Sequence, residues 1–317
     1  MSQTKLSQAL MAFQNNELQI NTEAVSQFKV AVNKINYEID IASDLETRKQ
    51  AYQLMYGIYS SPEVGYIPKD NSKMWYTLFN ADAKTITLVI RESQAKKVVA
   101  TLTIVFDSKL GLPLEGIYPN EVSELRKKNK FCAEIVALGF DESIRGFNEL
   151  LIHLFKFAYL IYRGIYGATD LLIKIKPRHA IFYEKKLLFK KLGNEVNSEK
   201  INNKNCILFG IDLVNAQNEV ELVLKSNMPY VKENKNIYKT FLMNQQDVVL
   251  MSELRKKVEN SEMSISEMEY FFIQQRNVFL NSSFDQLSLI ANSYSNQEKR
   301  KFIINYALMN FKNSIAV

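Results

Sequence analysis

The chain has 317 residues, of which 47% are hydrophobic and 23% are charged, and its formal net charge is +6. This length suits one large domain or two smaller ones, and the composition excludes a collagen-like or wholly disordered chain. The positive charge favours an acidic partner, such as nucleic acid, anionic lipid or an acidic protein.

The first 19 residues lack the apolar core of a signal peptide and predict a short amphipathic helix. The most apolar stretch, 150–166, is interrupted by His153, Lys156 and Arg163. It is also shorter than the ~20 residues that a membrane-spanning helix needs. We therefore expect a buried helix there, in a soluble cytoplasmic protein.

Strand and helix patterns alternate through the first two thirds of the chain. Alternating or β-branched runs predict strands over 29–41, 85–91, 98–106, 131–140, 169–175, 188–196 and 205–213. Helical spacing predicts helices over 45–58 (capped by Asp44), 120–128, 147–162 and 178–187. The helix over 147–162 is apolar on nearly all sides, so we expect it to be covered on both faces. The fold class is α/β (α+β).

Strand signals stop after about residue 214. Ser264 and Glu267 form a capping box that opens a helix, and 283–292 and 297–311 also have helical patterns. The sequence therefore divides into an α/β part, 1–213, and a helical C-terminal extension, 214–317.

Two cysteines and two histidines limit the metal and disulfide chemistry. Cys132 and Cys206 are far apart and have apolar neighbours, which predicts buried thiols in a reducing compartment. His153 and His179 are too few for a His-rich site, so we expect no metal.

A lone carboxylate interrupts the strand over 131–140. Alternation places Cys132, Glu134, Val136 and Leu138 on one face. Burial would raise the pKa of Glu134 and suit it to act as a general base. The alternative is a structural role, in which Glu134 pairs with a lysine or caps a bulge.

The turn over 141–146 joins this strand to the apolar helix. Free N–H groups at the start of a helix favour an anion, and Arg145 and Gly146 could help to hold a phosphate. The alternative, which the spacing alone favours, is an ordinary strand-to-helix turn.

The basic stretch 174–191 carries further candidates. Arg178 and His179 begin a short helix and could meet an anion, and Tyr183 could give a proton to a leaving thiolate. Each has a plainer alternative, as a turn, capping or core residue. A docking face for an acidic protein is predicted from Lys174, Lys176, Lys185, Lys186, Lys190 and Lys191. No nucleic-acid-binding motif accompanies them.

Three blocks of residues resemble the long-chain N-acyl amino acid synthases of the FeeM type, which have the GNAT fold and are related to acyl-homoserine-lactone synthases. The first is Pro177-Arg178-His179 with Phe182-Tyr183, Leu188-Phe189 and Gly193. The second is Tyr52, Met55-Tyr56 and Ile58-Tyr59, followed by Glu63 and Gly65; the third is Glu134. The resemblance covers 35–213. It departs from the family pattern at Met55 and Ala137, where arginine is usual.

The resemblance implies a GNAT-like mixed, mostly antiparallel sheet flanked by helices. It also implies transfer of a long-chain fatty acyl group from the phosphopantetheine arm of acidic acyl carrier protein to an amino acid or other small amine. No cofactor is expected, because acyl carrier protein or acyl-CoA is the co-substrate. A lipid product suggests peripheral membrane contact.

In this reaction Glu134 takes the proton of the amine and Tyr183 protonates the thiol. Backbone N–H groups from Val136 to Leu138 hold the thioester oxygen. Arg145 and Gly146, with Arg178 and His179, contact the phosphate or the carboxylate of the acceptor. Leu151, Phe155 and Ala158 line an acyl groove or, alternatively, are plain core. A homoserine-lactone synthase, a CoA-dependent acetyltransferase and a catalytically degenerate binding module remain alternative functions.

Overall fold

The computed structural model describes residues 28–32, 35–61, 71–144, 147–198 and 204–315. The expected amphipathic helix at the N-terminus lies outside these residues. In the described part, nine strands form one sheet in the order β1-β2-β3-β4-β5-β6-β9-β7, with β8 pairing to β9. The strands are β1 Phe28–Val32, β2 Ile35–Ile41, β3 Ile86–Glu92, β4 Val98–Phe106, β5 Cys132–Phe140, β6 Asp170–Ile175, β7 Lys190–Lys191, β8 Val196–Ser198 and β9 Lys204–Asp212.

The sheet is mixed and mostly antiparallel, as expected, because among the described strands only β5 and β6 pair in parallel. Two strand predictions need correction. The run over 29–41 is two antiparallel strands, β1 and β2. The run over 188–196 is not one strand: Leu188 turns the chain in the left-handed region at φ 59°, β7 takes only Lys190–Lys191, and β8 begins at Val196.

The helices of the α/β part begin and end close to their predicted bounds. They are α2 Leu45–Tyr59, α3 Pro119–Lys127, α4 Phe147–Tyr159 and α5 Ala180–Leu187. Asp44 caps α2 by accepting a 2.9 Å hydrogen bond from the Thr47 N–H. A π-helical turn, Leu160–Ile165, continues α4, and a 3-10 turn, Pro177–His179, precedes α5.

The C-terminal extension is helical. Its helices are α6 Ala216–Lys225, α7 Pro229–Glu233, α8 Lys235–Phe241, α9 Gln245–Glu259, α10 Ile265–Met268, α11 Phe284–Ser293 and α12 Gln297–Ile315. The predicted capping box is confirmed, since Ser264 and Glu267 exchange side-chain and backbone bonds at the start of α10.

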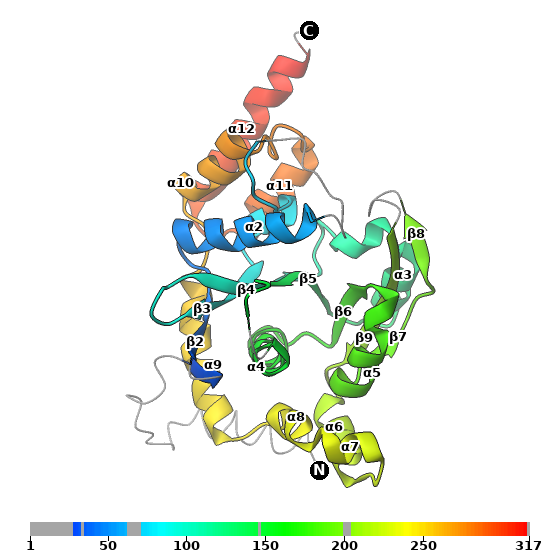
Figure 1. Ribbon diagram of the computed structural model, residues 1–317. Coiled ribbons are helices and arrows are strands. Elements are labelled where there is room, and N and C mark those ends of the chain that lie inside the picture. Colours follow the sequence, from blue (N-terminus) through cyan, green and yellow to red (C-terminus); the bar gives the residue numbers. More distant parts are fainter. Residues whose placement is uncertain (1–27, 33–34, 62–70, 145–146, 199–203, 316–317) are drawn as a thin grey trace, which may run out of the picture.

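The helices lie in layers on the two faces of the sheet (Figure 1). One face carries α2, with α10, α11 and α12 beyond it; the other carries α4, with α6 and α8 beyond. Helix α9 packs against the π-helical turn that continues α4, and it reaches β2, where Lys257 lies 2.8 Å from Asp40. Helix α4 is thus covered on both sides, as its sequence predicts.

Buried charges join the extension to the α/β part. The Lys156 ammonium on α4 lies 2.9 Å from the Asp247 carboxylate on α9, and both side chains are buried. On the opposite face, the buried Arg48 of α2 pairs with Glu267 of α10. No helix in the described ranges is long and apolar enough to cross a membrane.

Candidate active site

Strand β5 carries a bulge at Ala137. Thr103 pairs with Val136 and Thr101 with Gly139, so two residues of β5 lie between partners that are separated by one residue of β4. Ala137 itself has φ 50°, a conformation that costs a non-glycine residue about 1–3 kcal/mol. Such a bulge redirects both side chains and backbone N–H groups of its strand.

The bulge coincides with the place where β5 and β6 part. Their parallel pairing ends at Ile135 and Ile173 in the described ladder. The backbone of Val136 to Leu138 therefore faces a widening gap between the two strands. An N–H group on that side can bind a ligand oxygen, as the sequence predicts for these residues.

Because of the bulge, the β5 side chains do not all lie on the faces that strict alternation predicts. Cys132 and Val136 share one apolar cluster on the face opposite α4, as expected. Leu138 instead packs with the larger core on the α4 side. Alternation holds through Val136 and fails at Leu138, because the bulge adds a residue to the strand.

Glu134 is completely buried on the face opposite α4. One carboxylate oxygen accepts a 2.8 Å hydrogen bond from the Leu114 N–H, in the short 3-10 turn Pro113–Gly116. The other lies 3.3 Å from the ammonium of Lys174, on β6. The lysine pairing weighed in the sequence is therefore present, and it lies where β5 and β6 separate.

Burial raises the pKa of Glu134 to about 7, although Lys174 and the Leu114 N–H act in the opposite direction. The nearby Glu115 carboxylate also raises it. A carboxylate with this pKa exchanges protons near neutral pH, which is the range a general base requires. Pairing with a lysine and action as a base are thus compatible here.

Tyr59, at the end of α2, belongs to the same site. Burial and the Glu134 carboxylate raise the pKa of its phenol to about 12. Its ring lies 4.6 Å from that of Trp75, centroid to centroid. The sequence shows Tyr59 in a tyrosine-rich helix next to a loop with the only tryptophan, but it does not single out either residue as part of the site.

The two residues that depart from the family pattern, Met55 and Ala137, both lie near the bulge. Met55 is buried on α2 and packs over Gly139, where an added Cβ would lie 2.6 Å from its sulfur. Ala137 is two residues away on the same strand and is also buried. Apolar contact between α2 and β5 therefore occupies the place where the family pattern has arginine.

Tyr183 lies on the α4 face of the sheet. Its ring is edge-on to Phe155 of α4 and to Phe189, at 6.2 and 5.7 Å between centroids. Burial raises the pKa of its phenol well above the ordinary value. Glu134 and Tyr183 therefore lie on opposite faces of the sheet, and the structure does not place them side by side.

The remaining anion-binding candidates lie at the surface. Arg178 and His179 are exposed in the turn before α5, and the Arg178 Nε lies 3.3 Å from His179 Nε2. Partial loss of solvation and the positive charges of Arg178 and Lys176 lower the pKa of His179. Arg145 and Gly146 lie outside the described residues.

The predicted docking lysines divide into two groups. Lys185, Lys190 and Lys191 are exposed, whereas Lys176 and Lys186 are half-buried. Lys190 pairs with Glu219 at 3.2 Å, and Lys185 lies over the ring of Tyr230. Lys174 is separate from these five, because its ammonium faces Glu134.

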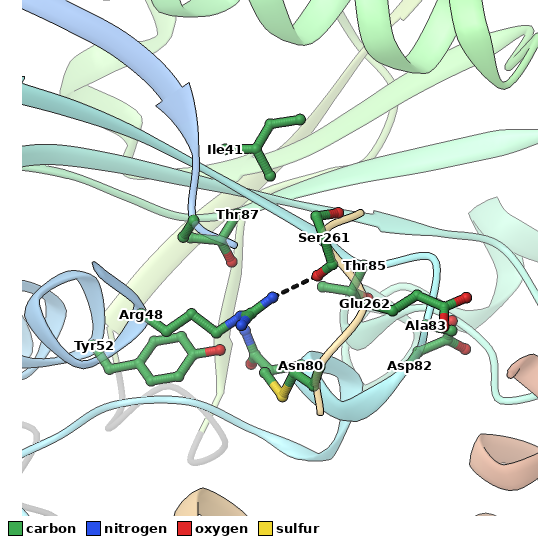
Figure 2. A pocket seen from close by; sticks show the side chains of 12 residues that line it. Ile41, Arg48, Tyr52, Asn80, Asp82, Ala83, Thr85, Thr87, Ser261 and Glu262 are labelled. Carbon is green, nitrogen blue, oxygen red and sulfur yellow. Dashed lines mark hydrogen bonds between the residues drawn. The ribbon is translucent and has the colours of Figure 1, made fainter. Parts of the chain in front are cut away.

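A second polar region lies between α2 and the loop after α9 (Figure 2). Figure 2 shows Arg48 pointing toward the Ser261 carbonyl, to which it donates a hydrogen bond. Glu267 neutralises the same guanidinium. These bonds of the Arg48 guanidinium attach the C-terminal extension to α2. Both cysteines are buried and free, as predicted.

Comparisons with known proteins identify one family. The family model described as "N-acyl amino acid synthase FeeM" matches residues 50–212, just over half of the chain. No curated protein matches the chain.

Three solved structures illustrate the similarity. FeeM from uncultured soil microbes is 22% identical, with a TM-score of 0.49, covering 57% of this chain and 92% of that one. The acyl-homoserine-lactone synthase LasI is 13% identical, with a TM-score of 0.42, covering 59% and 91%. ElaA from Escherichia coli is 11% identical, with a TM-score of 0.38, covering 56% and 99%.

Proposed function

The chain belongs to the N-acyl amino acid synthase FeeM family and is an acyltransferase, and we propose that it transfers a long-chain fatty acyl group from acyl carrier protein to the amine of an amino acid. The observation that carries this proposal is the buried Glu134 beside the bulge at Ala137, where β5 and β6 part. That arrangement brings a buried base and the bulged backbone of β5 to one gap.

The thioester lies in the gap between β5 and β6. The amine nitrogen attacks the thioester carbonyl, and a C–N bond forms as the C–S bond breaks. N–H groups from Val136 to Leu138 stabilise the charge that develops on the carbonyl oxygen. The proton lost by the amine passes through water to Glu134, whose pKa of about 7 suits it to accept and release protons.

Tyr183 protonates the departing thiolate from the other face of the sheet. Its raised pKa keeps the phenol protonated, as an acid requires. Tyr59 is a second phenol with a raised pKa, but it lies on the Glu134 side. Acid and base thus act from opposite faces on a thioester held between two strands.

An acidic carrier protein fits the basic surface. Exposed Lys185, Lys190 and Lys191, with half-buried Lys176 and Lys186, lie on α5 and its flanking segments. Arg178 lies on the same segment and meets the pantetheine phosphate or the carboxylate of the acceptor. Positive charge of this kind steers an acidic partner to its site. The acyl thioester is a co-substrate, so the reaction uses no further cofactor.

Incubation of the purified protein with a mixture of amino acids and with acyl carrier protein that bears acyl groups of defined length tests the proposal. Mass spectrometry should detect an N-acyl amino acid that requires the carrier-bound donor and is lost in Glu134→Gln. Glu233→Gln, which changes an exposed carboxylate on α7, is the matched control. Absence of product from the wild-type enzyme with both carrier-bound and CoA-bound donors would show the proposal to be wrong.

A further inference from the structure

Arg126, on α3, bridges two carboxylates close to the Glu134 site. Its Nε lies 2.9 Å from Asp107, which follows β4, and its Nη1 lies 2.8 Å from Glu115, in the 3-10 turn Pro113–Gly116. Its Nη2 donates to both acids. All three guanidinium nitrogens are therefore engaged, in a planar geometry that arginine provides and lysine cannot reproduce.

We infer that Arg126 is a positioning residue for the base: it fixes the turn whose Leu114 N–H binds Glu134, and it neutralises Glu115 beside that N–H. The inference rests on the proposed function, because it takes Glu134 as the base of that reaction. The recorded bonds of Arg126 go to Asp107 and Glu115, so it acts on Glu134 through the turn.

The contacts of this guanidinium belong to a closed chain that begins and ends on β5. On one side, the Asp107 N–H donates to the carbonyl of Cys132, the first residue of β5, over 2.9 Å. On the other side, Glu115 lies in the turn, and the Leu114 N–H of that turn returns to Glu134 over 2.8 Å. The turn is therefore held in place relative to the strand that carries the base.

The turn itself is held on two sides. The Leu114 side chain is fully buried in the apolar cluster on the face opposite α4. The Glu115 side chain folds back over the start of the turn, where its Oε1 accepts a 2.6 Å hydrogen bond from the Leu112 N–H. Gly111, at φ 83°, leaves room for this, because an added Cβ would lie 2.8 Å from the same oxygen. A contact that holds Glu115 therefore also holds the Leu114 N–H.

Among the described residues, the titratable groups that act on Glu134 come from β6, the turn and α2. Burial and the Glu115 carboxylate raise the pKa of Glu134, whereas Lys174 and the backbone N–H of the turn lower it. The Tyr59 phenol, on α2, also interacts with the Glu134 charge. Arg126 lowers the pKa of Glu115 and so keeps that carboxylate ionised, while its own positive charge offsets the negative one.

Two shifts in opposite directions test the inference. Arg126→Met frees the turn and leaves Glu115 without its counter-charge, so the pKa of Glu134 should rise by about one pH unit. Glu115→Gln removes the negative charge, and its amide oxygen can still accept the Leu112 N–H. The pKa of Glu134 should therefore fall by about half a pH unit. Loosening of the turn alone would raise it in both variants.

Carbon-13 NMR of protein labelled at the glutamate side-chain carboxyl measures this pKa without turnover, and Glu134→Gln identifies the signal. The same shifts should appear in the acidic limb of kcat/KM, with a carrier-bound hexadecanoyl donor and the amino acid that the wild type acylates. Lys127→Met is the matched control, because Lys127 is exposed on α3 and pairs with Glu124 at the surface. It removes the same positive charge and should leave both readouts at their wild-type values.

Arg126→Lys keeps the test decisive if Arg126→Met folds poorly. Lysine retains the charge beside Glu115, but one ammonium cannot reproduce the planar bonds to both carboxylates. The pKa of Glu134 should still rise, by less than about one pH unit.

An unchanged Glu134 titration in the folded Arg126 variants, or a shift in the same direction in Glu115→Gln, would overturn the inference. A wild-type protein that transfers no acyl group from carrier-bound or CoA-bound donors, but whose variants show the opposite shifts by NMR, supports the role of Arg126 around Glu134 and overturns the proposed reaction. The two failures are therefore distinguishable.

Discussion

The ammonium of Lys174 lies 3.3 Å from a carboxylate oxygen of Glu134, across two parallel strands that separate at this point. The Glu134 side chain has no exposed surface, whereas 22% of the Lys174 side chain is exposed. The pair therefore links the interior of the sheet to the surface in the gap. The charge of Lys174 affects the pH above which Glu134 can act as a base.

Replacing Lys174 by methionine should shift the pH dependence of catalysis. Lys174 lowers the pKa of Glu134, which burial and Glu115 raise, so its removal raises that pKa above about 7. Because the base acts when deprotonated, the acidic limb of kcat/KM should move to higher pH. Lys174→Arg, which keeps the charge, is the control, and an acidic limb that stays in place would argue against Glu134 as the base.

Glu134 should also make folding stability depend on pH. Its folded pKa is raised above the unfolded value, so its contribution to stability is present at low pH and is lost as pH rises through about 7. Glu134→Gln removes this loss of folding stability at higher pH. From pH 5 to pH 8, the unfolding free energy of the variant should gain about 2–3 kcal/mol relative to wild type, by urea denaturation. A constant difference would contradict the raised pKa.

Arg48 should be essential for the attachment of the extension. Its guanidinium is buried and binds both Glu267 and the Ser261 carbonyl. Arg48→Met leaves the Glu267 carboxylate buried without its partner, which costs about 3–5 kcal/mol in comparable pairs. Urea denaturation measures this loss. Lys49→Met, on the more exposed side of the same helix, should change stability by less than about 0.5 kcal/mol.

Gly139 is required for the close approach of α2 to the bulge. An alanine Cβ there would lie 2.4 Å from Ile58 Cδ1 and 2.6 Å from the Met55 sulfur. Gly139→Ala should destabilise the enzyme by about 1–3 kcal/mol through overpacking and lower kcat. The additional change Met55→Ala should recover part of both losses, and failure to recover either would show that this contact is not the cause.

Tyrosine substitutions should separate the two candidate acids. Tyr183→Phe removes the proposed proton donor and should lower kcat about 10²-fold, whereas Tyr59→Phe should have a much smaller effect. Both rings are retained, so the packing with Phe155 and Trp75 is kept. Steady-state kinetics with one acyl donor checks this, and the reverse ranking would assign the acid to the Glu134 face.

Local signals in the sequence predicted the elements but not the contacts between them. Asp44 and Ser264 mark helix starts because a cap depends on residues only three apart. The buried Glu134 was evident from the apolar residues around it. Its partner Lys174 was not, because the two residues become neighbours only after the α4 crossover brings β6 beside β5.

The sequence raised a bulge only as an alternative at Glu134 and did not place one at Ala137. Val136, Ala137 and Leu138 continue the apolar strand without a glycine, yet Ala137 takes a positive φ. The Leu114 N–H is a backbone group, and no residue type reveals where it donates. The site therefore depends on two features, a backbone distortion and a backbone donor, that side-chain patterns do not encode.

The buried ion pairs have a consequence for synthesis of the chain. Arg48 and Glu267 are 219 residues apart, and Lys156 and Asp247 are 91 apart. While the C-terminal helices are still in the ribosome, Arg48 and Lys156 have no partners, and α4 is covered only by the sheet. The native core is therefore completed only after the helices beyond residue 214 have been made, and nascent chains that lack them are candidates for chaperone binding.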